Sequence, residues 1–202
     1  NLLGAEQSGF IADLGYETYQ KILKEAVTEL RNEEFAELDK SDTLDGDGED
    51  YVADCVIESD LELLLPAMYV PTESERIALY RELDGIERET DLMEFRSRLT
   101  DRFGTIPQET SELLRIPTLR RLARRLGIEK VSLKQGKMFT YFVDESNKAY
   151  YQSDMFGRML NYLTAHPRRV QIRENGGKRS FAILNVKTVE TAVAILQEII
   201  GT

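Results

Sequence analysis

The chain has 202 residues, and its 42% of hydrophobic and 31% of charged residues are typical of a globular protein with one substantial core or two small ones. Its net charge of −10 disfavours free nucleic acid as the main partner, because phosphate binding requires a cationic surface, and it favours a basic protein surface instead. The only cysteine, Cys55, excludes a framework of disulfides within the chain and fits a reducing cytoplasm.

The N-terminal part of the chain divides into a helix and an acidic linker. Residues 16–31 have apolar side chains at helical spacing, which predicts a long connecting helix. Residues 32–50 lose this periodicity and predict a linker. From Glu29 to Glu62 there are 14 acidic residues against two basic ones, a net charge of −12, so this stretch carries more than the whole chain's negative charge.

Residues 51–127 predict a mainly helical segment. Residues 51–59 are expected to be extended, and an apolar strand or loop follows up to Tyr69. Thr72 and Glu75 form the sequence pattern of a capping box. Glycine or proline residues mark the ends of the helices that follow. The expected helix starts are Thr72, Thr90, Pro107 and Pro117, and the expected stops include Gly104 and Gly127.

Residues 128–202 predict a small β-β-α-β-β-α unit in which two helices pack on one sheet. The expected strands are 128–134, 137–143, 168–174 and 179–185, with helices at 154–164 and 188–200. Tyr150 and Tyr151 are expected to extend the second strand or to form a short additional one. The fold class is therefore α+β, divided into 1–31, 32–50 and a C-terminal domain at 51–202, and both one core and two cores remain open for 51–127 and 128–202.

Catalytic chemistry finds little support in these residues. Cys55 and His166 are the only residues of their kinds, and no local signature joins them as a catalytic pair. The acidic loop at 45–50 lacks the glycine and glutamate of a calcium-binding loop, and the chain contains no phosphate-binding loop. We therefore expect a non-enzymatic chain without a metal or cofactor.

Residues 115–138 carry a net charge of +7. Four arginines of the fourth helix are expected opposite its leucines, on one solvated face: Arg120, Arg121, Arg124 and Arg125. One interpretation is a patch that binds phosphate groups of a nucleic acid. The favoured alternative is internal pairing with the acidic region 29–62.

Asp101 lies near the end of its expected helix, where the helix dipole disfavours an acid. This position indicates a cationic partner outside the helix, although a simply solvated aspartate is equally compatible with the physics.

An ordered set of segments carries a resemblance to a known family. The segments are Tyr69-Val70-Pro71, residues 76–83, Asp101-Arg102-Phe103-Gly104-Thr105-Ile106-Pro107 and residues 119–128. Together they resemble the C-terminal domain of the bacterial transcription-repair coupling factor, mainly over residues 55–128. Residues 1–9 resemble the end of the translocation motif of that family, in which Gln7 and Gly9 match positions that couple ATP hydrolysis to movement on duplex DNA.

The resemblance implies a regulatory domain of an ATP-dependent DNA translocase that removes stalled RNA polymerase and recruits the damage-recognition ATPase of nucleotide excision repair. In the family this domain is an autoinhibitory clamp on the recruitment module of the same protein, and acids on one helix contact arginines of that module. Asp101 matches one such acid, whereas Arg98 stands where a second acid is expected, so Glu94 becomes a candidate contact. The net charge of the chain disfavours a DNA partner for this segment, and a nucleic-acid module using the basic face 115–138 is the alternative.

Overall fold

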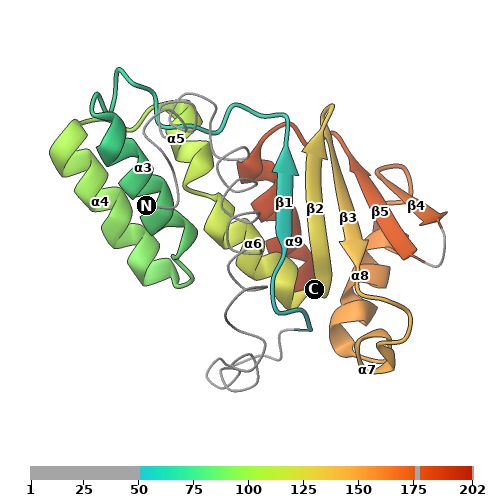
Figure 1. Ribbon diagram of the computed structural model, residues 1–202. Coiled ribbons are helices and arrows are strands. Elements are labelled where there is room, and N and C mark those ends of the chain that lie inside the picture. The colour runs from blue at the N-terminus through green and yellow to red at the C-terminus, as the bar shows by residue number, and fades with distance from the viewer. Residues whose placement is uncertain (1–50, 176–177, 202) are drawn as a thin grey trace.

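The computed structural model describes residues 51–175 and 178–201, which form an α+β fold as predicted (Figure 1). A short strand and four helices come first in the chain, and a mixed segment of strands and helices follows. The helices are α3 (Glu73–Asp84), α4 (Glu89–Phe103), α5 (Gln108–Leu113), α6 (Ile116–Arg125), α7 (Lys148–Tyr151), α8 (Asp154–Ala165) and α9 (Val189–Gly201). The strands are β1 (Val56–Ser59), β2 (Ile128–Lys134), β3 (Lys137–Phe142), β4 (Val170–Asn175) and β5 (Lys178–Leu184). The expected helix at 16–31 and the linker at 32–50 lie outside the described residues.

The five strands form one sheet in the order β1-β2-β3-β5-β4. β1 runs parallel to β2, and the other neighbours are antiparallel. The β2–β3 turn is formed by Gln135 and Gly136, both with positive φ, as a tight two-residue hairpin requires. Because β1 precedes the helical segment but pairs with β2, the sheet draws on both halves of the predicted C-terminal domain. Buried side chains of both halves also belong to one continuous hydrophobic core.

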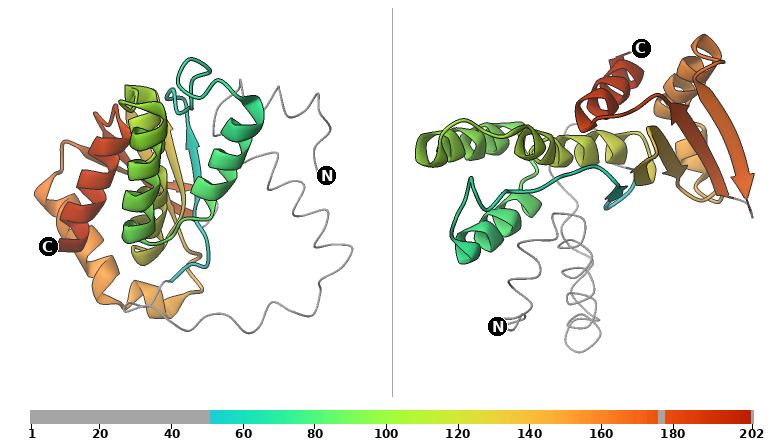
Figure 2. Two further views of the ribbon diagram at one scale, coloured as in Figure 1. Left: turned by 90° about the vertical axis from the view of Figure 1, so that its left-hand side faces the viewer. Right: turned by 90° about the horizontal axis from the view of Figure 1, so that it is seen from above.

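Helices α6, α8 and α9 lie on the same side of the sheet, and α6 and α8 each pack against α9 (Figure 2). Alternate residues of β3 show the resulting asymmetry. Met138, Thr140 and Phe142 are buried against these helices, while the side chains between them are only partly buried. None of the described helices covers the opposite face over β2, β3, β5 and β4 (Figure 1).

Tyr150 explains an error in the sequence-based assignment. Tyr150 and Tyr151 lie in helix α7 instead of a strand. The side chain of Asn147 caps this helix by accepting a hydrogen bond from the Tyr150 backbone N–H at 3.2 Å. The buried Tyr150 hydroxyl donates to the Leu126 carbonyl at 2.5 Å, and its ring covers Gly127, whose φ is +72°. These tertiary contacts override the strand preference of two consecutive tyrosines.

The start of α3 gives a second correction. Thr72 is the N-cap residue of α3, but its side chain makes no capping hydrogen bond, so the predicted capping box does not form. Glu75 instead forms an ion pair with Arg102 of α4. The helix still begins where the sequence predicts, because two acids in its first turn favour the helix dipole.

Side chains of the neighbouring helices hold the irregular segment between β1 and α3 in place. The Tyr80 hydroxyl accepts from the Leu65 N–H at 2.8 Å, and Thr110 Oγ1 donates to the Leu64 carbonyl at 2.8 Å. Buried Arg76 donates to the carbonyl of Val70 at 2.6 Å. These contacts satisfy backbone groups that would otherwise be buried without partners, so a segment without regular structure has a defined path.

Candidate functional site

The outward face of α4 carries the candidate residues that the sequence indicated. The opposite stripe, Leu92, Phe95 and Leu99, is buried in the core. Glu94, Arg98 and Asp101 are three or four residues apart and are all exposed, so they share the outward face of the helix.

Arg98 points its charge toward α3. It forms an ion pair with Glu82, and the hydrogen bond that it donates to the Glu82 carboxylate raises the pKa of the Arg98 guanidinium further above its usual value. Arg102, the residue after Asp101, forms an ion pair with Glu75. The two arginines that flank Asp101 are therefore both engaged with acids of α3.

Asp101 itself is exposed, and no ion pair joins it to any residue within 51–175 or 178–201. Its position in the last turn of α4 places a negative charge beside the negative end of the helix dipole, which is unfavourable for the helix. A cation from another protein surface could occupy this site without displacing a partner from the described part of the chain. The structure thus brings Glu94, Arg98 and Asp101 together on one surface.

Met68 is a residue of this surface that sequence reasoning missed. Its side chain is 97% exposed, although Tyr69 and Val70 beside it are buried. The Tyr69 hydroxyl contacts the carbonyls of Leu99 at 3.2 Å and Gly104 at 2.9 Å, which places Met68 at the same end of the α3–α4 hairpin as Asp101. The sequence shows only an apolar run from Leu63 to Val70, and no signal in that run separates the exposed methionine from its buried neighbours.

The basic face on α6 differs from the prediction. The arginines are partly buried instead of solvated, and the side chains of Arg120 and Arg124 are only 13% exposed. Among the described residues, their acidic partners are the last residue of α3, a residue of the loop that follows it and the first residue of α4. The pairs are Arg120–Asp84 at 3.4 Å, Arg121–Glu89 at 3.4 Å and Arg124–Glu87 at 3.6 Å. The preference for internal pairing is thus supported, with different acids, while Arg125 is partly buried.

Lysines further along the basic segment do pair with the predicted acidic region. Lys130 and Lys134 lie 3.2 Å and 3.4 Å from the Glu58 carboxylate oxygens. Burial opposes ionisation of Glu58, but hydrogen bonds and charges from the two lysines outweigh it and lower the pKa of this carboxyl group. This cluster links β1 to β2 on the face of the sheet that no described helix covers.

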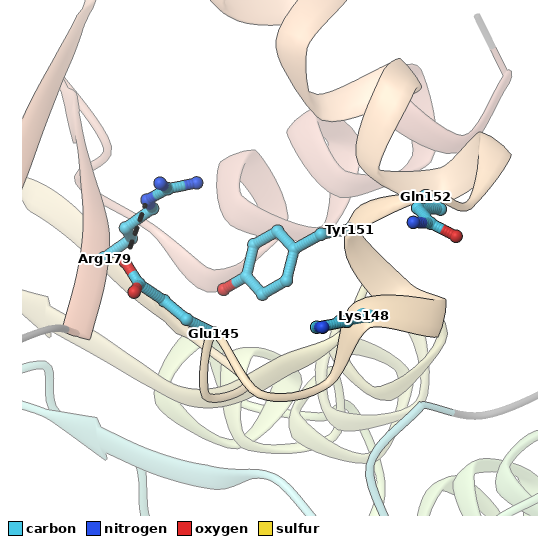
Figure 3. A pocket seen from close by; sticks show the side chains of 5 residues that line it. All are labelled: Glu145, Lys148, Tyr151, Gln152 and Arg179. Carbon is cyan, nitrogen blue, oxygen red and sulfur yellow. Dashed lines mark ion pairs between the residues drawn. The ribbon is translucent and has the colours of Figure 1, made fainter.

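A small pocket of about 220 Å³ lies beside α7 (Figure 3). Glu145 and Arg179 in its lining form an ion pair at 3.6 Å, and Arg179 also lies 5.6 Å from the centre of the Tyr151 ring. The Tyr151 hydroxyl donates to the Val143 carbonyl at 2.6 Å. Lys148 and Gln152 complete the wall (Figure 3). Glu145, Arg179 and the Tyr151 hydroxyl of this pocket thus have partners, and its lining does not contain a nucleophile and base pair.

The other residues considered for chemistry lie apart from one another. Cys55 is buried, and burial raises the pKa of its thiol to about 12, which makes the thiolate scarce. His166 instead stacks on Tyr162 at the end of α8. Within residues 51–175 and 178–201, no three His, Cys, Asp or Glu side chains gather as metal ligands. No helix in that part of the chain has the length and apolar character needed to cross a bilayer. Gln7 and Gly9 lie outside the described residues.

The fold and the site define an α+β domain whose candidate site is a charged surface on a helical hairpin. Residues 59–153 match the family model of the TRCF domain. A crystal structure of the C-terminal domain of a transcription-repair coupling factor aligns with a TM-score of 0.58 and 17% identity, over 73% of this chain and 94% of that chain.

Curated relatives carry the same name. Transcription-repair-coupling factors of Rickettsia typhi and Staphylococcus epidermidis are 27% and 34% identical to this chain, over 87% and 66% of its length. The factor of Haemophilus influenzae is 31% identical over 79% of the chain. The aligned region spans only 14%, 10% and 13% of these three proteins. The chain belongs to the transcription-repair-coupling factor family and corresponds to its C-terminal domain.

Proposed function

We propose that this domain is a non-catalytic, autoinhibitory clamp within an ATP-dependent DNA translocase that removes stalled RNA polymerase. In this proposal the outward face of α4 packs on the module of the same protein that recruits the damage-recognition ATPase of excision repair. The clamp masks that module and restrains the motor until polymerase or DNA engages the rest of the protein.

The exposed carboxylate of Asp101 is the observation that carries the proposal. It is unfavourable for its own helix and has no ion pair among the described residues, whereas the arginines beside it are engaged with Glu82 and Glu75. The pairing of Arg98 with Glu82 also accounts for the departure from the family pattern, because it removes the repulsion that an arginine would exert on a basic partner. Exposed Met68 adds an apolar contact at the same end of the hairpin.

A weak contact is sufficient for this function. A tethered domain has an effective concentration of about 1 mM, so an intrinsic Kd near 100 µM leaves roughly nine molecules in ten closed. Opening then costs about 1.4 kcal/mol, which binding of a partner elsewhere in the protein can supply.

The test is a titration of this chain against the recruitment module of its parent protein. We expect saturable binding that Asp101→Arg weakens at least about tenfold, because the substitution opposes two cations. Glu129→Arg is the matched control, since it reverses the same charge at an exposed residue of β2, away from α4, and should leave binding unchanged. Arg98→Glu should strengthen binding by restoring an acid on this face.

The full-length protein provides the second measurement. Asp101→Arg should raise its basal translocation or its binding of the repair ATPase. Absence of binding up to millimolar module, or equal effects of Asp101→Arg and Glu129→Arg, would contradict the clamp. The alternative, a nucleic-acid module on α6, is disfavoured by the ion pairs that engage Arg120, Arg121 and Arg124.

A further inference from the structure

The face of the sheet opposite α6, α8 and α9 carries two aromatic side chains on its central strand. Phe139 and Tyr141 are two residues apart on β3, so their side chains project from the same face, and both are partly exposed. The ladder register places Ser132 and Ala182 on either side of Phe139, and Ser180 beside Tyr141. These neighbours have small side chains, and the two rings between them keep part of their surface exposed.

Cationic side chains surround the two rings. Lys130 Nζ lies 5.4 Å from the centre of the Tyr141 ring, and the Arg173 guanidinium lies 5.5 Å from the centre of the Phe139 ring. Lys134 and Lys137 are directly opposite each other in the β2–β3 hairpin. Like charges at opposed positions destabilise a sheet, so stability does not explain this pair.

Most of the chain's negative charge comes from one stretch of the sequence, of which β1 is a part. Residues 29–62 carry a net charge of −12, so the remainder of the chain carries +2. On the open face, four cations (Lys130, Lys134, Lys137 and Arg173) lie near two acids: Glu58 pairs with the first two, and Asp60 accepts a hydrogen bond from the Gln135 N–H at the β2–β3 turn. The face therefore combines a local positive charge with partly exposed aromatic rings.

We propose that the open face of this sheet binds single-stranded nucleic acid, with Phe139 and Tyr141 stacking on two bases and the four cations contacting phosphates. A strand rises about 3.4 Å per residue, so the two rings are about 7 Å apart along β3. Adjacent bases of a duplex are separated by about 3.4 Å, so rings at this spacing fit bases that have been splayed apart in a single strand.

Other ligands match this combination less well. Duplex DNA hides the faces of its bases, so the exposed rings would have no role in binding it. An acidic peptide would use the cations but gains little from two flat aromatic faces. Base stacking on aromatic side chains beside cations is the usual basis of sequence-tolerant binding to single strands. This inference is independent of the clamp, which uses α4.

The test measures binding of the 202-residue chain to fluorescent 12-mers of dT and rU and to a duplex of equal length. We expect the single strands to bind and the duplex to bind much more weakly. Phe139→Leu and Tyr141→Leu keep apolar bulk but remove the aromatic face, and each should weaken binding about tenfold. Lys137→Gln should make the plot of log association constant against log salt concentration less steep by about 0.7, because one phosphate contact is lost. Glu58→Gln should strengthen binding by removing the acid that pairs with Lys130 and Lys134.

Ile172→Ala is the matched control, because Ile172 is 61% exposed on β4 and projects from the opposite face. It should leave binding unchanged, and circular dichroism should show that every variant remains folded. The proposal fails if no single strand binds, if the duplex binds equally well, or if the two leucine variants bind like wild type. Polyglutamate is the competitor. If it displaces the single strand from the leucine variants as well as it does from wild type, the face is a surface for acidic proteins, and the proposal is overturned.

Discussion

The two faces of strand β3 both carry aromatic residues but have different surroundings. On one face, Phe142 packs against Phe181 with ring centres 4.8 Å apart, and the helices cover both. On the other, Phe139 and Tyr141 lie beside cations with no described helix above them. Aromatic content alone therefore does not distinguish core from surface in this strand; the position of the helices does.

Phe142→Ala and Phe139→Ala compare the two faces directly. The first removes a ring that is 2% exposed and should lower the free energy of unfolding by about 4 kcal/mol. The second should cost about 1 kcal/mol, mainly through the lower strand preference of alanine. Urea denaturation of both variants measures the difference, and equal losses would show that the open face is covered in solution.

Gly127→Ala tests the packing of the Tyr150 ring on Gly127, on the side of the sheet that the helices cover. A Cβ at this position would lie 2.3 Å from the Tyr150 ring, and the residue has a φ of +72°, so we expect a loss of about 3 kcal/mol. Gly136→Ala is the control, because its φ is +71° but its nearest neighbour would be Lys187 Cγ at 3.8 Å. It should cost only about 1 kcal/mol. Similar thermal unfolding of the two variants would mean that Tyr150 moves away at little cost.

Glu112→Ala tests how the helical segment holds α9 over the covered face. The Glu112 carboxylate accepts hydrogen bonds from the backbone N–H groups of Val189 at 3.2 Å and Glu190 at 3.0 Å. Loss of this cap should lower the free energy of unfolding by about 2 kcal/mol. Glu109→Ala on the same helix should change it by less than about 0.5 kcal/mol. Hydrogen exchange at the start of α9 should rise in the first variant alone, and unchanged exchange would contradict the capping role.

The smallest effect concerns the pH dependence of the open face. The pKa of the Glu58 carboxyl is lowered in the folded protein from an ordinary value of 4.5, so the unfolded state binds more protons just below that pH. The stabilisation is therefore present above about pH 4.5 and is lost as the pH falls through the folded pKa. As the pH is lowered from about 6 to about 3, the urea concentration at the midpoint of unfolding should fall less steeply for Glu58→Gln than for wild type. Parallel curves would show that the lysines do not stabilise the carboxylate.

The helices of residues 73–125 could be predicted closely from the sequence, because Leu92, Phe95 and Leu99 recur at helical spacing and glycine or proline residues mark the boundaries. The error at Tyr150 arose from contacts with Leu126 and Gly127, which are more than twenty residues away in the chain. The pairing of β1 with β2 could not be predicted, since four helices separate the two strands.

The site was predictable only in part. Asp101 could be identified from its position at the end of a helix, but its surroundings depend on the pairing of Arg98 with Glu82, which no local pattern indicates. The arginines of α6 were assigned to a solvated face because the sequence does not show that Asp84 and Glu87 come to lie beside them. Charged residues can be counted from a sequence, whereas the tertiary structure decides which of them are free to contact a partner.

The contacts of Tyr69 have a consequence for the cost of association. Because its hydroxyl contacts the carbonyls of Leu99 and Gly104, the turn that carries Met68 is joined to the last turn of α4. A partner that contacts Met68 and Asp101 together therefore meets a preorganised surface, and little conformational entropy is lost in ordering it. Attachment and release can then proceed by rigid-body movement of the whole domain, without folding or melting of the contact surface.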